Sequence, residues 1–347
     1  MRTTVIRTGV VVSALAVVLA GCGSDGGSSG GEAVEGDWDA VVTAANEEGE
    51  VLLYSSQNPT RLEALEAAFE DAYPDIDMKF VRGTDAEMNP KVEVENQTGR
   101  GTADVHMVTD AAWITTVSES GQYSVADLRG PSFDDPAFNR DENVIADSFF
   151  LTSAAVFAMG WNTDAVPDGF EEPQDMLDDE YAGKIGIVNP QGIAAYVDFY
   201  SFYEENFGPD FVEQLAELEP RIYPSALGIA QALTSGEIVA APGVQPLVAE
   251  VEAGAPVDWK LPDPAWGTPW YSHILKVAPH PNAAQVLADF MVSAEGQAAL
   301  NTGYASVLGE GDGAVADASS IELPDPDALT PEQVQAYQQE WESLFLQ

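Results

Sequence analysis

Short apolar runs alternate with amphipathic stretches along most of the chain. The run Val51–Tyr54 predicts a buried strand, and Leu62, Leu65 and Phe69 recur at the spacing of one helix face. The segment Thr60–Glu63 predicts a capping box at the start of that helix, with its threonine as the N-cap. Strands that alternate with helices in this way form parallel units covered by helices on both faces of the sheet. The sequence therefore predicts an α/β fold.

The same pattern continues to the end of the chain, whose 347 residues suffice for about two domains. The stretch 149–161 is apolar without a helical period and predicts a long strand. Pro90 lies within an expected helix, which it either kinks or starts. Further strands are expected at 76–80, 104–108, 184–188, 221–223, 238–241, 257–261 and 270–278, and further helices at about 84–97, 111–120, 193–206, 225–234, 282–301 and 331–345.

Residues 1–21 have the pattern of a secretory signal peptide. Arg2 and Arg7 supply positive charge, and the apolar run after them is shorter than the roughly 20 residues that span a bilayer. The run ends at Leu19–Cys22, which resembles the lipobox of prokaryotic lipoproteins, where the cysteine is lipidated and becomes the mature N-terminus. Residues 22–37 then form a glycine- and serine-rich tether. We therefore expect an exported protein, anchored to the outer face of the cell membrane through the lipid on Cys22.

The charge of the chain is strongly one-sided, with 58 Asp and Glu residues against 13 Lys and Arg, a net charge of −45. Such a surface repels polyphosphates, which excludes a nucleic-acid-binding role. It resembles the surfaces of proteins adapted to salty surroundings, where 1 M salt screens charges within about 3 Å. Cys22 is the single cysteine, so no internal disulfide can form. Three scattered histidines are too few for a zinc site.

Small and polar residues follow several of the expected strands and directly precede helices. In open α/β sheets ligands lie outside the carboxyl ends of the strands, and the free N–H groups of helix starts favour anions. Ordinary helix caps and turns would give the same pattern, and Asp110 in particular could either accept from a ligand or cap its own helix. The candidate ligand contacts are Ser55, Ser56, Gln57, Thr84, Asp110, Ala111, Gln191, Gly192, Ser225 and Tyr271, the last from an aromatic cluster that lines a cleft or packs in the core.

Signatures of catalysis are missing from the sequence. It contains no Gly-x-Ser-x-Gly elbow, no complete P-loop and no Gly-x-Gly-x-x-Gly turn after a strand. In so acidic a chain an isolated Asp or Glu is far better explained as solvated surface than as a general acid. We therefore expect no enzymatic activity and no cofactor. A secreted α/β hydrolase and a structural envelope lipoprotein are the alternatives from other classes.

An ordered series of short motifs resembles a known family over about residues 48–308. The motifs are Val51–Gln57, Val81–Thr84, Ala103–Ala111, Tyr181–Gly186, Tyr223–Ser225, Ala278–Ala284 and Ser293–Gln297. Together they resemble extracellular solute-binding proteins of ABC importers, in the group that includes ferric-iron, thiamine and phosphonate binders, here in lipoprotein form. The resemblance implies a type II periplasmic-binding fold, with two α/β lobes, mostly parallel sheets flanked by helices, and two crossover hinge segments. The ligand cleft lies between the lobes and closes around its ligand.

The same resemblance implies boundaries and partners. Lobe 1 is expected to comprise 38–155 plus 265–347, and lobe 2 to comprise 156–264, with 149–161 and 270–278 as the crossover segments. The expected partners are the permease and ATPase subunits of an ABC importer and a small-molecule or ion ligand. The receptor itself is expected to be a monomer.

The ligand stays open among three classes. Ferric binders of this group carry an adjacent tyrosine pair after the strand of a Gly-Glu-x-x-x-Ala segment, whereas here Gly236–Ala241 is followed by Pro242–Gln245. Iron would therefore need Tyr196, Tyr223 and Tyr271 to converge. Helix starts and hydroxyl groups favour a small carboxylate or phosphonate over ferric iron. A cation such as a polyamine, held by acidic and aromatic side chains, is the third class.

Overall fold

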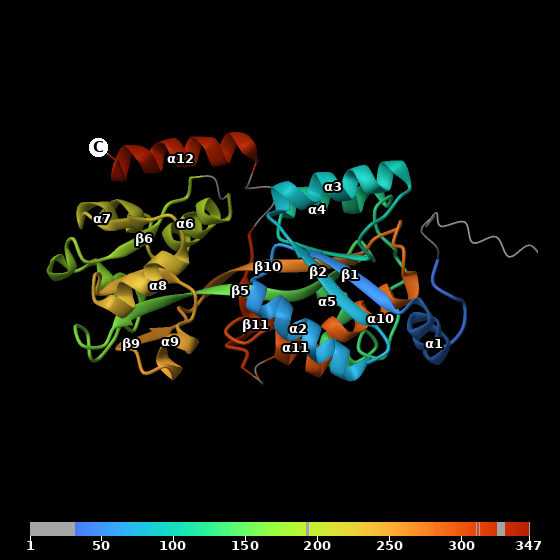
Figure 1. The fold of residues 1–347 in the computed structure, drawn as a ribbon. Helices are drawn as coiled ribbons and strands as arrows, with labels where there is room; N and C mark the ends of the chain where they lie inside the picture. The colour runs from blue at the N-terminus through green and yellow to red at the C-terminus, as the bar shows by residue number, and fades with distance from the viewer. Residues whose placement is uncertain (1–31, 192–193, 310, 312, 325–329, 347) are drawn as a thin grey trace, which may run out of the picture.

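The structure, a computed structural model, describes residues 32–191, 194–309, 311, 313–324 and 330–346. The expected signal peptide, Cys22 and Gly192 lie outside these residues. Two bodies are joined by two long strands, and we call the body built on α1 to β4 lobe 1 and the body built on β6 to β9 lobe 2 (Figure 1). No helix in the described part of the chain is long and apolar enough to cross a membrane.

Helices and strands alternate as the sequence predicts. Lobe 1 contains α1 (Trp38–Glu48), β1 (Glu50–Ser55), α2 (Pro59–Ala72), β2 (Asp77–Arg82), α3 (Asp85–Thr98), β3 (Val105–Val108), α4 (Ala111–Ser120), α5 (Arg140–Asn143), β4 (Val144–Ile145), α10 (Pro281–Met291), α11 (Ala294–Leu300), β11 (Ala305–Ser306), β12 (Ala316–Asp317) and β13 (Ile321–Glu322). Lobe 2 contains β6 (Gly186–Val188), α6 (Ala194–Phe207), α7 (Phe211–Glu217), β7 (Arg221–Tyr223), α8 (Ala226–Ser235), β8 (Ala240–Val244), α9 (Val248–Glu252) and β9 (Val257–Lys260). The strands β5 (Phe149–Asn162) and β10 (Ala265–Ile274) run through both lobes, and α12 (Pro331–Phe345) ends the chain.

One sheet passes through both lobes because β5 and β10 belong to each. Its order is β12-β11-β5-β10-β3-β1-β2, with β4, β8 and β9 also paired to β5 and β13 paired to β10. The ladders β2-β1-β3 and β6-β7 are parallel, as expected, whereas every ladder that β5 forms is antiparallel. The carboxyl ends of β1, β2 and β3 meet at one edge of the parallel part, so the helices that follow these strands start side by side.

Two separate apolar cores support the two lobes. On β5, Val156 packs in the core of lobe 1 and the next residue, Phe157, packs in the core of lobe 2. On β10, Trp266 packs in the core of lobe 2, and Trp270 and Ile274 pack in the core of lobe 1. A buried core on each side, with only two strands and their neighbours between, is the arrangement in which lobes can move as units.

The last helix differs from its expected place. Residues 265–347 were expected in lobe 1, but α12 lies over α6 and α7 of lobe 2 (Figure 1). Its Trp341 is 1% exposed and packs in the core of lobe 2. Because an amphipathic helix is placed by the core that its apolar face meets, the assignment of α12 to lobe 1 is wrong.

Three local predictions also need correction. The helix expected at 282–301 is two helices, because the Ser293 hydroxyl accepts from the Gly296 N–H at 3.1 Å and caps a new helix, α11. The strand expected at 270–278 starts five residues earlier and ends at Ile274. The α2 helix begins at Pro59, with Asn58 as its N-cap, so the capping box expected at 60–63 does not form.

A buried carboxylate in lobe 1 makes stability depend on pH. Asp289 of α10 is 2% exposed and accepts from Ser132 N at 2.7 Å, Ser132 Oγ at 3.1 Å and Phe133 N at 3.2 Å. Burial outweighs these hydrogen bonds and raises the pKa of Asp289 from 3.8 to about 6. The folded state therefore holds this proton more tightly than the unfolded state does.

We expect this carboxylate to lower the free energy of unfolding as pH rises from about 4 to about 6, because ionisation costs more in the folded state. Two pKa units correspond to about 3 kcal/mol. The free energy of unfolding should be measured with urea for the wild type and for Asp289→Asn across this pH range. The difference between the two proteins should change by about 3 kcal/mol from the lower to the higher pH. The exposed Asp141→Asn should follow the wild type, and a pH-independent difference for Asp289→Asn would contradict the expectation.

Candidate functional site

A cavity of about 300 Å³ lies between the lobes, where α8 and α9 of lobe 2 face α2 and α11 of lobe 1 (Figure 1). We call it the inter-lobe cavity. Lobe 1 contributes the start of α2 and the turn after α11, and lobe 2 contributes the start of α8 and the segment from β8 into α9. The lining residues are Asn58, Arg61, Thr302, Gly303 and Tyr304 from lobe 1, and Ala226, Leu227, Ala230, Gln245–Glu250 and Glu252 from lobe 2.

Arg61 is the cation of this cavity. It lies in the first turn of α2, which starts directly after β1, and its side chain is half-buried. Its guanidinium forms no ion pair and no hydrogen bond with the described residues, and its contact is the face of the Tyr304 ring, 6.0 Å from the ring centre. In a chain where acids outnumber bases by 58 to 13, an unpaired guanidinium at a cavity is a site ready for an anion.

Aromatic side chains form the lobe 1 wall behind Arg61. Tyr304 is 6% exposed, burial raises its pKa, and its ring meets the edge of Trp270 with 5.7 Å between ring centres. The Trp270 Nε1–H donates to Ser56 Oγ at 3.3 Å. The Gln245 side chain reaches the Tyr304 hydroxyl from lobe 2. These contacts hold the Tyr304 ring in place beside Arg61, and the contact with Gln245 joins the two lobes at the cavity.

The lobe 2 wall begins at the N-terminus of α8. Ser225 occupies the N-cap position, but its hydroxyl does not cap the helix. The Ala226 N–H bonds the Tyr196 hydroxyl, and Leu227 in the same turn is 66% exposed although it is a large apolar residue. The positive potential at the N-terminus of α8 therefore adds to the positive charge of Arg61 on the opposite wall of the cavity.

The residues expected after β1 lie close to the cavity but do not line it. Ser55 is fully buried, and its hydroxyl accepts from the Gln57 N–H at 3.0 Å. Gln57 is also fully buried; its Oε1 accepts from the Asn58 N–H at 2.8 Å and its Nε2 has no partner in the described part of the chain. Ser56 reaches the wall through Trp270 as described above. The chain turns from these residues directly into Asn58 and Arg61.

The residues expected after β2 and β3 act as helix caps. Thr84 donates from its N–H and its hydroxyl to the Glu87 carboxylate, which makes the capping box of α3. Asp110 accepts from the Trp113 N–H at 3.0 Å and caps α4, so of the two roles left open for it the structure shows the cap. Ala111 is the first residue of α4.

Two further candidates are engaged elsewhere. The Gln191 amide donates to the Gln338 carbonyl of α12 at 3.2 Å, and the Gln338 amide donates back to Pro190 at 2.9 Å. Tyr271 packs against the cluster that contains Val108 and Phe149 and also against the lobe 1 core that contains Trp270. The cavity lining thus includes none of the nine candidates that the structure describes, although Gln57 and Ser225 directly adjoin residues that line it.

The three tyrosines that iron would need make separate contacts. Tyr196 bonds the start of α8, the Tyr223 hydroxyl donates to Glu237 at 3.0 Å, and Tyr271 packs in lobe 1. Pro246 and Leu247, which follow β8, line the cavity with side chains that cannot bind a metal. Among the described residues no group of three or more His, Cys, Asp or Glu could hold a metal ion. The three tyrosines therefore do not converge on this cavity.

Most of the aromatic cluster noted in the sequence is core packing. His273 is fully buried and stacks on Phe149 with 4.3 Å between ring centres. Its Nε2 shares a hydrogen bond with the Nδ1 of His106 at 3.1 Å. Burial lowers the pKa of both histidines, that of His106 to about 3, so both are neutral near neutral pH. Only Trp270 of this cluster reaches the inter-lobe cavity, through its contact with Tyr304.

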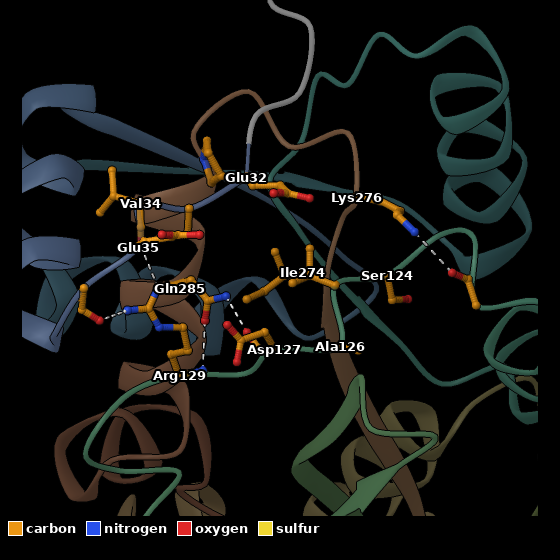
Figure 2. Close-up of a pocket in the computed structure, with 15 residues that line it drawn as sticks. Glu32, Val34, Glu35, Ser124, Ala126, Asp127, Arg129, Ile274, Lys276 and Gln285 are labelled. Carbon is orange, nitrogen blue, oxygen red and sulfur yellow. Dashed lines mark hydrogen bonds between the residues drawn. The ribbon is translucent and has the colours of Figure 1, made fainter.

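A larger cavity of about 660 Å³ lies where the described chain begins, between residues 32–36 and α10 (Figure 2). Its arginine is already engaged: Arg129 Nη1 donates to the Val34 carbonyl at 2.8 Å and Nη2 to the Gly36 carbonyl at 2.6 Å. Arg129 therefore holds the N-terminal segment against lobe 1 through hydrogen bonds, whereas the Arg61 side chain forms no hydrogen bond with the described residues. This contrast favours the smaller inter-lobe cavity as the functional site.

Two α/β lobes joined by crossover strands, with a cavity between them that is lined by charged and apolar side chains, define the class of two-lobed solute receptors. The family comparison agrees: residues 64–310 match the model of the bacterial extracellular solute-binding protein family, and the chain belongs to this family. It is therefore a bacterial extracellular solute-binding protein. A search of curated proteins returns no match.

Solved structures show the same fold at low sequence identity. A substrate-binding protein of an ABC transporter from Agrobacterium tumefaciens is 16% identical, with a TM-score of 0.67 over 87% of this chain and 97% of that one. Iron-bound HitA from Pseudomonas aeruginosa is 19% identical, with a TM-score of 0.62 over 84% and 99%. AfuA from Actinobacillus pleuropneumoniae, solved with fructose-6-phosphate, is 20% identical, with a TM-score of 0.61 over 86% and 99%. Such different ligands on one fold leave the choice of ligand to the residues of the cavity.

Proposed function

We propose that this chain is a lipid-anchored receptor that binds a small carboxylate or phosphonate in the inter-lobe cavity and delivers it to an ABC importer. Cys22 carries the lipid after removal of residues 1–21, and residues 22–37 form the tether; the intact mass of chain extracted from membranes tests this anchor. The lobes meet near residues 155/156 and 264/265, and β5 and β10 act as hinges. The receptor works as a monomer without a cofactor and performs no catalysis.

The observation that carries this proposal is the guanidinium of Arg61, which has no ion pair and no hydrogen bond among the described residues. It faces the start of α8 across the cavity, so an acid group placed between Arg61 and this helix start would be attracted by both of them. An anion held in this way favours the closed arrangement, because only closure brings both walls within contact. The exposed Leu227 would lose its contact with water in the same movement.

A thermal-shift panel of small carboxylates, phosphonates, ferric salts, polyamines and thiamine tests the proposal. A ligand at about 100 times its Kd should stabilise the folded chain by about 2.7 kcal/mol. We expect carboxylates or phosphonates to give the largest shifts. A panel in which only ferric salts or polyamines stabilise the chain, or in which nothing does, would contradict the proposed ligand class.

A further inference from the structure

The two walls of the inter-lobe cavity carry opposite charge. Lobe 1 presents Arg61, and lobe 2 presents Glu250 and Glu252 from α9. Neither carboxylate is paired with Arg61 or with any other cation of the described residues. The cavity therefore separates a cation from two anions and leaves both sides without a partner.

A ligand of one charge satisfies only one of these walls. A simple anion is attracted by Arg61 and repelled by Glu250 and Glu252, and a simple cation meets the reverse. Screening reduces such repulsion in open solvent, but it becomes stronger as the lobes close and expel water. A molecule with an acid group at one end and a charged nitrogen at the other is attracted by both walls.

The surface between the charged groups is apolar. Leu227, 66% exposed at the start of α8, and the ring of Tyr304 lie on opposite sides of the cavity. A volume of about 300 Å³ is at the lower end of the range for small-molecule pockets. This size and lining suit a short aliphatic chain between two charged ends.

We propose, resting on the receptor function above, that the ligand of the inter-lobe cavity is a small zwitterion. Its carboxylate or phosphonate bonds Arg61, its charged nitrogen lies against Glu250 and Glu252, and its aliphatic part covers Leu227. The ligand then joins an α2 contact on lobe 1 to an α9 contact on lobe 2. Closure would thus be selective for solutes that carry both charges.

Titration calorimetry with a matched series tests this assignment. The probes are ω-amino acids from three to six carbons, the corresponding unsubstituted carboxylates and alkylamines, and 2-aminoethylphosphonate beside ethylphosphonate. We expect the best zwitterion to bind at least 10-fold more tightly than the acid or the amine of the same length. The double variant Glu250→Gln/Glu252→Gln should lose about 10-fold in affinity for the zwitterion and bind the simple acid more tightly.

The control is Glu205→Gln/Glu213→Gln, which removes two exposed carboxylates of lobe 2 outside this cavity and should leave the preference unchanged. Simple acids that bind as tightly as the zwitterions, with an Arg61-dependent affinity, would overturn the zwitterion assignment and leave the proposed receptor for anions in place. Absence of binding across the whole series would overturn both.

Discussion

Arg61→Met should weaken the binding of a carboxylate or phosphonate at least 100-fold, about 3 kcal/mol, while leaving the fold as stable as before. The loss is large because the guanidinium is the cation of the inter-lobe cavity and donates in a planar fork that matches an acid group. The stability should stay within about 0.5 kcal/mol, because Arg61 makes no ion pair or hydrogen bond with the described residues. Calorimetry and urea unfolding measure the two quantities.

The matched control is Arg129→Met, which changes the net charge equally. Arg129 donates to the Val34 and Gly36 carbonyls, so its loss should lower stability and leave the affinity unchanged. Arg61→Met is thus expected to lower affinity but not stability, and Arg129→Met to lower stability but not affinity. An Arg61→Met variant with unchanged affinity would place the anion elsewhere and leave only the family assignment.

The sequence predicted those elements whose signals are local. The strands β1 and β3 are apolar runs bounded by polar turns, and α4 starts at an aspartate that caps it. The error at α10 and α11 has a physical origin, since apolar periodicity continues across Ser293 and hides the break. The early start of β10 was missed because Gly267 disfavours a strand, although a Cβ there would lie 2.6 Å from the Ala155 carbonyl of β5.

The site was harder to predict than the fold. Arg61 lies within the segment expected to form a capping box, and no motif of the sequence singles it out as a ligand contact. Its neighbours in space, Gln245 and Tyr304, follow it by well over a hundred residues, and only the packing of two lobes brings them together. Hydroxyl groups that follow the strands bond to nearby groups of their own segment, as Thr84 does to Glu87 and Ser55 does to Gln57.

Charge is informative at the scale of the cavity rather than of the whole chain. A net charge of −45 would favour a cationic ligand everywhere on the surface, and screening weakens that field. At the inter-lobe cavity Arg61 favours an anionic group on the lobe 1 wall. Glu250 and Glu252 favour a cationic group on the lobe 2 wall. We therefore expect a few side chains that face each other across the cavity to select the ligand, rather than the net charge of the chain.

The second large effect concerns the junction of α10 and α11, where Gly296→Ala should destabilise the chain by about 3–5 kcal/mol. A Cβ on Gly296 would lie 1.9 Å from the Phe290 carbonyl oxygen and 3.1 Å from the Met291 Cα, and backbone atoms cannot move aside as a side chain can. The adjacent Gln297 is buried; its amide donates to the Thr152 and Met291 carbonyls, and its oxygen accepts from the Val307 N–H. Moving α11 outward to admit the methyl group would break these bonds.

Gly228→Ala provides the matched comparison, because Gly228 is also a helical glycine. A Cβ there meets only Tyr223 side-chain atoms, at 3.4 Å and beyond, so alanine should leave stability unchanged or raise it by up to about 1 kcal/mol through helix propensity. Urea unfolding should therefore show a large loss of stability for Gly296→Ala, and no change or a small gain for Gly228→Ala. Equal changes in the free energy of unfolding would show that α10 and α11 are not packed backbone against backbone.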